Sequence, residues 1–188
     1  MPDPQTEPTG TPSPREALGQ CHRCIAGMLD RLETLAGELA APARDAGRAD
    51  RARALVAEID EALGVHLVDE ESEVFPAVLA AAESPARRAQ AFELVSSLLV
   101  EHREIAELWH ALRIALLALG SGVEVAFPGG TAADFLVRFR SHLARENVEL
   151  DDLMAQVGAE RSREMGTAMA NRHEEACIRA RNGPLDRP

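Results

Sequence analysis

Aromatic residues make up only 3% of this chain, and tyrosine is absent altogether. Strands favour aromatic and β-branched side chains, whereas the abundant alanine and leucine favour helices, so this usage predicts an all-α fold. Cysteine is also scarce, and the three residues Cys21, Cys24 and Cys177 cannot form a disulfide framework. Because there is no apolar run of about eighteen residues, the sequence predicts no transmembrane helix.

Basic residues are outnumbered, with 20 arginines and lysines against 31 acidic residues and a formal net charge of −11. Such a surface repels phosphate, which argues against nucleic acid or an anionic membrane as a partner. The N-terminal segment has neither the basic start nor the apolar stretch of a secretory signal. Residues 1–12, rich in proline, threonine and acidic groups, are predicted to be a disordered leader, and we expect a cytoplasmic protein.

Signals that begin helices stand before three segments with periodic apolar residues. Ser13 and Ser84 are each followed by proline, which combines a good N-cap with a residue tolerated in the first turn. Thr131, with Asp134 three residues later, resembles a capping box and predicts the start of the fourth helix. Apolar residues then recur every three or four positions, as in amphipathic helices.

The second helix is predicted over residues 49–82, with an interruption at Pro76 because proline disrupts a helix interior. A last short helix is predicted over residues 161–180. Four long amphipathic helices with modest connections predict an up-down four-helix bundle with a short extra C-terminal helix. The chain is accordingly divided into a leader (1–12), a bundle (13–157) and a C-terminal helix and tail (158–188).

Histidine and glutamate form a unit that occurs twice: a histidine, a second histidine 44 or 40 residues later, and a glutamate four residues after that. Residues four apart share one face of a helix, about 6 Å apart along its axis, so each His–Glu pair can bind one metal centre. These residues fall in apolar stripes, where an unpaired carboxylate costs roughly several kcal/mol unless a cation accompanies it. The predicted metal ligands are His22, His66, Glu70, His102, His142 and Glu146.

Four imidazoles and two carboxylates exceed what one structural zinc ion takes, because such sites have about four ligands, commonly Cys and His. Calcium and magnesium prefer oxygen ligands. The set suits two iron ions, each with two imidazoles, that share the bridging carboxylates of Glu70 and Glu146. Manganese and zinc stay open as alternatives, and the remaining coordination positions would hold water, oxide or a small molecule.

These motifs, taken in order, resemble the hemerythrin-like family, the HHE cation-binding domain. The likeness covers residues 14–157 and rests on four motifs: Cys21-His22-x-x-Ile25, His66-x-x-x-Glu70-Glu71-x-x-x-Phe75-Pro76, Glu101-His102-Arg103 and His142-x-x-x-Glu146. The tail at Met169-Ala170-x-Arg172 also resembles the end of some bacterial members, so a bacterial stand-alone member is expected. The resemblance implies a four-helix bundle around a non-haem di-iron site held by the six ligands named above.

Two departures distinguish the chain from the oxygen-carrying hemerythrins of invertebrates. Ala106 stands where their third helix has a second histidine, and Glu146 stands in place of a more distant aspartate in their last helix. With one ligand fewer the site is more open, so we expect a protein that binds or senses dioxygen or a related small ligand. The alternatives are a di-iron enzyme acting on peroxide or nitric oxide, and an iron-responsive interaction module. A monomer or homodimer is expected, and no protein partner is indicated.

Other polar residues near these motifs are expected to have lesser roles. Glu71 and Glu73 are expected to be solvated or to support the ligands from outside. His110 lies two turns beyond the third-helix ligand and is expected at the surface. Cys21 and Cys24 are expected to be small buried packing residues, with a redox pair as the weaker alternative.

Overall fold

The computed structural model describes residues 13–40, 47–123 and 125–181, and the regular secondary structure there is entirely helical. The predicted leader, residues 1–12, and the end of the tail, residues 182–188, lie outside the described residues. In chain order the elements are α1 (Pro14–Ala40), α2 (Arg48–Asp69), a π-helical segment η1 (Glu70–Val74), α3 (Phe75–Ala81), α4 (Pro85–Gly120), α5 (Gly129–Met154) and α6 (Ala159–Arg181).

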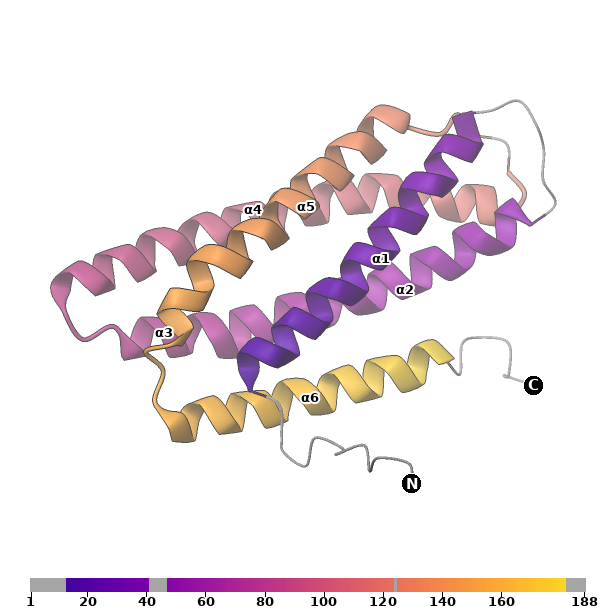
Figure 1. The fold of residues 1–188 in the computed structure, drawn as a ribbon. Helices are drawn as coiled ribbons and strands as arrows, with labels where there is room; N and C mark the ends of the chain where they lie inside the picture. The colour runs from indigo at the N-terminus through magenta and orange to yellow at the C-terminus, as the bar shows by residue number, and fades with distance from the viewer. Residues whose placement is uncertain (1–12, 41–46, 124, 182–188) are drawn as a thin grey trace, which may run out of the picture.

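Helices α1, α2, α4 and α5 form a four-helix bundle with up-down topology (Figure 1). α1 packs against α2 and α5, and α4 packs against the same two helices, so the four close into a ring. α3 follows α2 beyond η1 and packs onto α4 and α5. The predicted fold class is therefore confirmed. None of the helices in the described ranges is both long and apolar enough to cross a membrane.

Hydrogen bonds confirm the predicted starts of the first and third bundle helices. Ser13 Oγ accepts from the backbone N–H of Glu16 at 3.2 Å, and the Glu16 carboxylate accepts from the N–H of Ser13 at 2.8 Å. These two bonds complete a capping box at the start of α1. At the start of α4, Ser84 Oγ accepts from the N–H of Arg87 at 3.2 Å.

One predicted helix boundary is wrong. α5 begins at Gly129 rather than near Thr131, and it has no side-chain cap. The Pro128 carbonyl accepts from the N–H of Ala132 at 3.0 Å, which extends the helix back past Thr131. The predicted C-terminal helix over residues 161–180 is present as α6, which spans 23 residues and packs along α1 and α2.

The interruption predicted at Pro76 takes the form of a wide turn just before it. Proline has no N–H, and its ring clashes with the carbonyl four residues back, so the regular hydrogen-bond pattern cannot continue there. In η1 the N–H of Phe75 donates to the Glu70 carbonyl, a step of five residues rather than four. At this wider turn the consecutive residues Glu70 and Glu71 both face α4, where the carboxylates of both lie close to His102.

Two apolar clusters fill the core, and a layer of buried polar residues separates them. The first cluster joins α1, α2, α4 and α5 and includes Leu32, Ile59, Leu112 and Phe135. The second cluster adds α3 and α6 and is drawn from residues 17–18, 74–82, 91–98, 150–153, 165 and 169. The buried histidines and carboxylates lie between the two clusters along the chain.

Helix α6 lies outside the bundle, along α1 and α2 (Figure 1). Its Met165 and Met169 are almost fully buried, at 1% and 0% exposure, and belong to the second apolar cluster. Burying two such side chains contributes roughly 3–6 kcal/mol relative to leaving them exposed. α6 is therefore part of the folded unit and covers the bundle near η1.

Candidate metal centre

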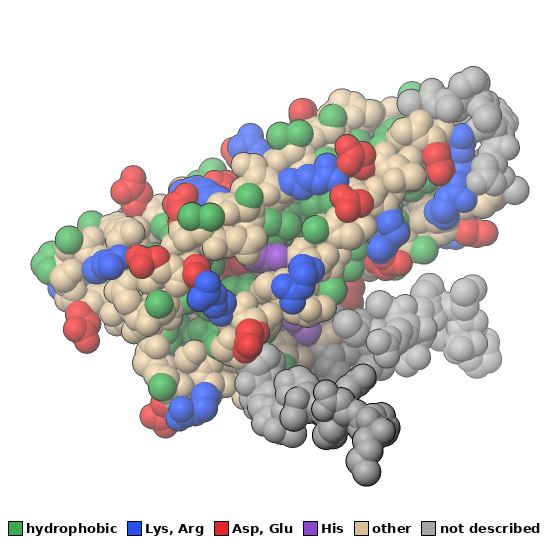
Figure 2. All heavy atoms as spheres, in the orientation of Figure 1, with side chains coloured by type: hydrophobic (Ala, Val, Ile, Leu, Met, Phe, Trp, Pro, Cys, Tyr) green, Lys and Arg blue, Asp and Glu red, His purple; other side chains and the backbone are tan. Residues whose placement is uncertain are grey.

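All six predicted ligands are buried, and none of them exceeds 6% exposure. α1, α4 and α5 supply the histidines at positions 22, 102 and 142, and α5 also supplies the glutamate at 146. The remaining His–Glu pair spans α2 and the first residue of η1. Histidine side chains are visible only as small patches between the helices on the face drawn in Figure 2, as expected for largely buried residues.

Five of these residues form one compact cluster. One ligand atom from each lies within 4.8 Å of all the others, and the five residues are His66, Glu70, His102, His142 and Glu146. His102 Nε2 lies 3.1 Å from Glu70 Oε2, and His142 Nε2 lies 3.0 Å from Glu146 Oε1. The structure therefore brings imidazole and carboxylate groups from three walls of the bundle to one point.

His22 completes the layer from the fourth wall. Its Nε2 lies 3.5 Å from Glu146 Oε2 and 3.9 Å from Glu70 Oε1. His102 Nε2 also lies 3.8 Å from Glu146 Oε1. Glu70 and Glu146 therefore each lie close to the imidazoles of both His22 and His102. All six predicted ligands are brought together, with His22 at the border of the cluster.

Three of the histidines are held in place through Nδ1. His22 Nδ1 lies 2.9 Å from Asn147 Oδ1, and His102 Nδ1 lies 2.8 Å from Glu71 Oε1. His142 Nδ1 lies 2.8 Å from Glu101 Oε2. Because these oxygens accept hydrogen bonds, each of the three imidazoles in its neutral form carries its proton on Nδ1, which leaves the lone pair of Nε2 for a metal ion. This tautomer is the one that a metal ligand requires.

The three supporting residues are sequence neighbours of ligands on the adjacent helix. Glu71 follows Glu70 in the chain and holds His102 of α4. Glu101 precedes His102 and holds His142 of α5. Asn147 follows the glutamate of α5 and holds the histidine of α1. Of these, the sequence indicated only Glu71. The signal for the other two is adjacency to a ligand, since Glu101 lies beside His102 and Asn147 beside Glu146.

His66 differs from the other histidines because neither of its ring nitrogens has a hydrogen-bond partner in the described structure. Its Nδ1 lies 3.6 Å from Glu70 Oε1, and its Nε2 lies 3.7 Å from Glu146 Oε2. The ring is fully buried and packs against Phe139, with ring centroids 6.0 Å apart. Packing, rather than a hydrogen bond, fixes its orientation.

Burial and mutual charge shift the ionisation of the centre strongly. Burial, reinforced by the charge of Glu146, raises the pKa of Glu70 well above its usual range. Burial would also raise the pKa of Glu146, but contacts with His102 and His142 hold it well below its usual range. Burial alone would lower the pKa of His102, yet the carboxylates of Glu146, Glu70 and Glu71 raise it to about 9. The pKa of His66 falls to about 3 because desolvation outweighs the opposing charge of Glu146.

A buried carboxylate next to the centre was not anticipated from the sequence. Asp69 is 0% exposed and precedes Glu70 in the chain. Its Oδ1 accepts from Arg172 Nε, and its Oδ2 lies 2.7 Å from His173 Nε2. Both partners belong to α6, so the C-terminal helix neutralises a buried charge beside a predicted ligand. Neither the spacing nor the local sequence signals this pairing, because its members lie about a hundred positions apart.

Expectations for the other polar residues are partly confirmed. Glu71 supports a ligand from outside the centre, and Glu73 faces α6 rather than the cluster. His110 is exposed, as expected for a surface residue. Cys21 is buried as expected, but the expectation for Cys24 is wrong, because that residue lies on the outward side of α1 and is exposed.

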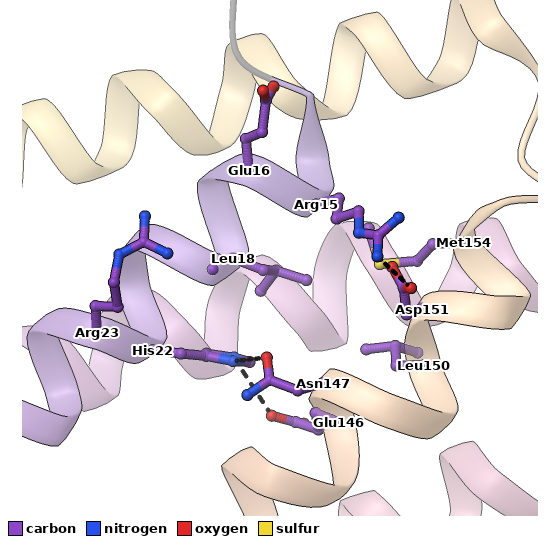
Figure 3. A pocket seen from close by; sticks show the side chains of 11 residues that line it. Arg15, Glu16, Leu18, His22, Arg23, Glu146, Asn147, Leu150, Asp151 and Met154 are labelled. Atoms are coloured by element: carbon purple, nitrogen blue, oxygen red, sulfur yellow. Dashed lines mark hydrogen bonds and ion pairs between the residues drawn. The ribbon is translucent and has the colours of Figure 1, made fainter.

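A surface cavity of about 380 Å³ between α1 and α5 reaches the centre. Its floor includes His22, Asn147 and Glu146, which lie together at the bottom of the view in Figure 3. The cavity walls combine apolar and charged side chains from both helices. The buried layer can therefore be approached from one side by a small molecule.

Comparison with known proteins agrees with this geometry. The family described as "Hemerythrin HHE cation binding domain" matches residues 13–153, which is most of the chain and all of the bundle. The comparison with curated proteins found no match, and neither did the comparison with solved structures. The matched range contains all six predicted ligands, and it ends before α6. The chain belongs to the hemerythrin HHE cation-binding family.

Proposed function

We propose that the centre holds two iron ions, bridged by Glu70 and Glu146, and that the protein binds or senses dioxygen or a related small ligand. The supporting observation is a set of buried polar atoms without hydrogen-bond partners. They are Nε2 of His22, His102 and His142, both ring nitrogens of His66, and all four carboxylate oxygens of Glu70 and Glu146. Such atoms are costly in a protein interior, and a bound cation would satisfy them.

The chemistry of the donors supports iron over the alternatives. The cluster holds nitrogen and oxygen donors only, and the buried thiol of Cys21 does not belong to it. Four imidazoles with two carboxylates exceed a structural zinc site and contain too much nitrogen for calcium or magnesium. Manganese stays an alternative. When bound, iron would supply a redox-active cation that can take a small exogenous ligand.

The chain itself contributes orientation, charge and exclusion of water. Asn147, Glu71 and Glu101 keep three imidazoles in the tautomer that binds metal. The apolar clusters on both sides of the layer restrict the access of water to it. Ala106 lies on the same helix as His102, at the position where the resemblance places an additional histidine in the oxygen carriers. Its methyl group cannot bind a metal ion, so this chain offers one ligand fewer.

Metal analysis tests the proposal directly. Protein produced with iron is expected to contain about two iron ions per chain, and its visible spectrum is expected to change when the reduced protein meets air. His142→Ala removes a buried ligand, whereas His110→Ala removes an exposed histidine and serves as the matched control. Loss of iron in the first variant alone is the expected result. Wild-type protein without iron, or an equal iron content in both variants, would contradict the proposal.

A second candidate is a di-iron enzyme acting on peroxide or nitric oxide. The observation that favours it is the cavity, which gives molecules larger than dioxygen a path to Glu146 and His22. Repeated consumption of peroxide would support this candidate, whereas a single stoichiometric reaction would support a binding or sensing protein. An iron-responsive interaction module, a cytoplasmic location and a monomeric or homodimeric state stay predictions.

A further inference from the structure

The carboxylates in and beside η1 contact two different neighbours. Glu70 and Glu71 lie close to His102 of α4, with carboxylate oxygens 3.1 Å and 2.8 Å from its ring nitrogens. Asp69, which directly precedes η1, and Glu73 within η1 contact α6 instead. η1 therefore lies between the metal centre on one side and the C-terminal helix on the other.

Two arginines of α6 hold the carboxylates that face this helix. Arg172 Nε donates to Asp69 Oδ1, and Arg172 Nη2 lies 3.7 Å from Glu73 Oε1. Arg161 Nη2 donates to the other oxygen of Glu73 at 2.8 Å. The two arginines stand eleven positions apart, which is about three full turns, so both project from one face of α6. The guanidinium of Arg172 thus contacts one residue before the π turn and one residue inside it.

Apolar side chains hold α6 on the bundle near η1 without fixing its register. Met165 and Met169 stand between the two arginines, and they belong to the same apolar cluster as Val74 of η1, which is 0% exposed. Apolar attraction has no preferred direction and methionine is flexible, so these contacts alone permit small shifts of α6. The ion pairs restrict such shifts because each of them requires a particular pair of atoms to meet.

The π turn depends on contacts from outside because a regular helix competes with it. A π turn contains one residue more than an α turn and is rare. Each residue of an α-helix turns about 100° around the axis, so loss of the extra residue would rotate Glu71 away from Glu70 and from its place at His102. The same rotation would separate Asp69 from Glu73 around the axis, and Arg172 could no longer contact both.

We propose that Arg172 and Arg161 are positioning residues for the metal centre. By holding the carboxylates on the α6 side of η1, they maintain the π turn, and the π turn keeps Glu70 and Glu71 directed at the centre. Metal binding and docking of α6 stabilise each other, because both favour the same form of η1. The inference deepens the proposed function, on which it rests only for the presence of a metal ion at the centre.

The affinity of the full chain for zinc, measured by competition with a chelator, tests the positioning role. Arg172→Gln should weaken zinc binding about tenfold, as for residues that support metal ligands from outside. Arg161→Gln should weaken it about two- to fivefold, because Arg161 has 44% of its side chain exposed. Arg172→Lys should recover part of the loss, since an ammonium group can still pair with Asp69. Arg163→Gln removes an exposed arginine of the same helix and is the matched control, with unchanged affinity.

Two further measurements separate positioning from a general loss of stability. Ser84→Ala removes the cap of α4, far from η1, and should lower the unfolding free energy without changing the zinc affinity. Hydrogen exchange follows the Phe75 amide, whose bond to the Glu70 carbonyl closes the π turn, and the amides of residues 159–173. Zinc should slow exchange at both places in the wild type. In Arg172→Gln, zinc should still slow exchange at Phe75 but no longer in α6.

Several results would overturn the inference. Equal zinc affinities in Arg172→Gln and Arg163→Gln would do so, as would a wild-type chain that binds no zinc, or a loss of affinity in Ser84→Ala as large as that in Arg172→Gln. If Arg172→Gln fails to fold, Arg161→Gln decides, and an affinity equal to that of the wild type would count against the positioning role.

Iron content, measured separately, decides the proposed function. A chain that holds two iron ions and keeps its zinc affinity in Arg172→Gln refutes only the positioning role. A chain with the expected zinc affinities and no iron refutes only the di-iron centre.

Discussion

Removal of Arg172 should destabilise the protein far more than removal of a neighbouring arginine on the same helix. Arg172 forms an ion pair with Asp69, which is completely buried, and His173 Nε2 lies 2.7 Å from the other oxygen of the same carboxylate. Breaking a buried ion pair from one side costs about 3–5 kcal/mol because the other charge is left without its partner. Arg172 keeps 28% of its side chain exposed and His173 remains in place, so the expected loss is smaller, about 2 kcal/mol. In a chain of this size that loss lowers Tm by roughly 4–8 °C.

The assay is urea or thermal unfolding of metal-free Arg172→Gln, with Arg163→Gln as the control. Arg163 is exposed on α6 and has no side-chain partner among the described contacts, so its replacement should change the unfolding free energy by less than about 0.5 kcal/mol. Adding Asp69→Asn to Arg172→Gln should recover part of the loss, because the buried carboxylate is then gone. Equal losses for the two arginine variants, or no recovery in the double variant, would refute the reasoning.

Three further results are expected. Glu71→Ala should weaken metal affinity about 10- to 100-fold in competition with a chelator, because it frees Nδ1 of His102; affinity equal to wild type would show that Glu71 does not orient the ring. Ser84→Ala should lower the free energy of unfolding in urea by about 1 kcal/mol through loss of the α4 cap, and an unchanged midpoint would contradict this. Removing the metal should lower stability by about 4 kcal/mol when the metal was present at a thousand times its Kd, and identical Tm values with and without metal would argue against a site in the folded state.

The fold and the buried cluster of histidines and glutamates could be predicted because their signals are local. A four-residue step from His66 to Glu70 and from His142 to Glu146 fixes a shared helix face, and the apolar stripes around them fix which face is buried. Pro76 likewise signals its own interruption. The π-helical form of this interruption could not be predicted, because the extra residue of a π turn is accommodated by packing against the surrounding helices.

Residues that support the ligands could not be predicted from periodicity. Glu101 and Asn147 act on histidines of other helices, 41 and 125 positions away, and their own helices give no hint of that partner. The burial of Asp69 could not be predicted either, because the cation that pairs with this carboxylate lies on α6, far away in the sequence. The start of α5 was misplaced because Thr131 offers a cap that the extended helix does not use. Long-range contacts, rather than local preference, decide each of these features.

Each supporting residue stands next to a predicted ligand in the sequence and holds a histidine of another helix, and this links the rotations of neighbouring helices. Turning α4 about its axis would displace His102 and, through Glu101, would also pull His142 of α5 out of alignment. Turning α5 would in the same way reach α1 through Asn147. A disturbance at one of these walls is thus passed to the neighbouring wall. Occupancy of the centre should accordingly report on the alignment of all the walls at once rather than on any single side chain.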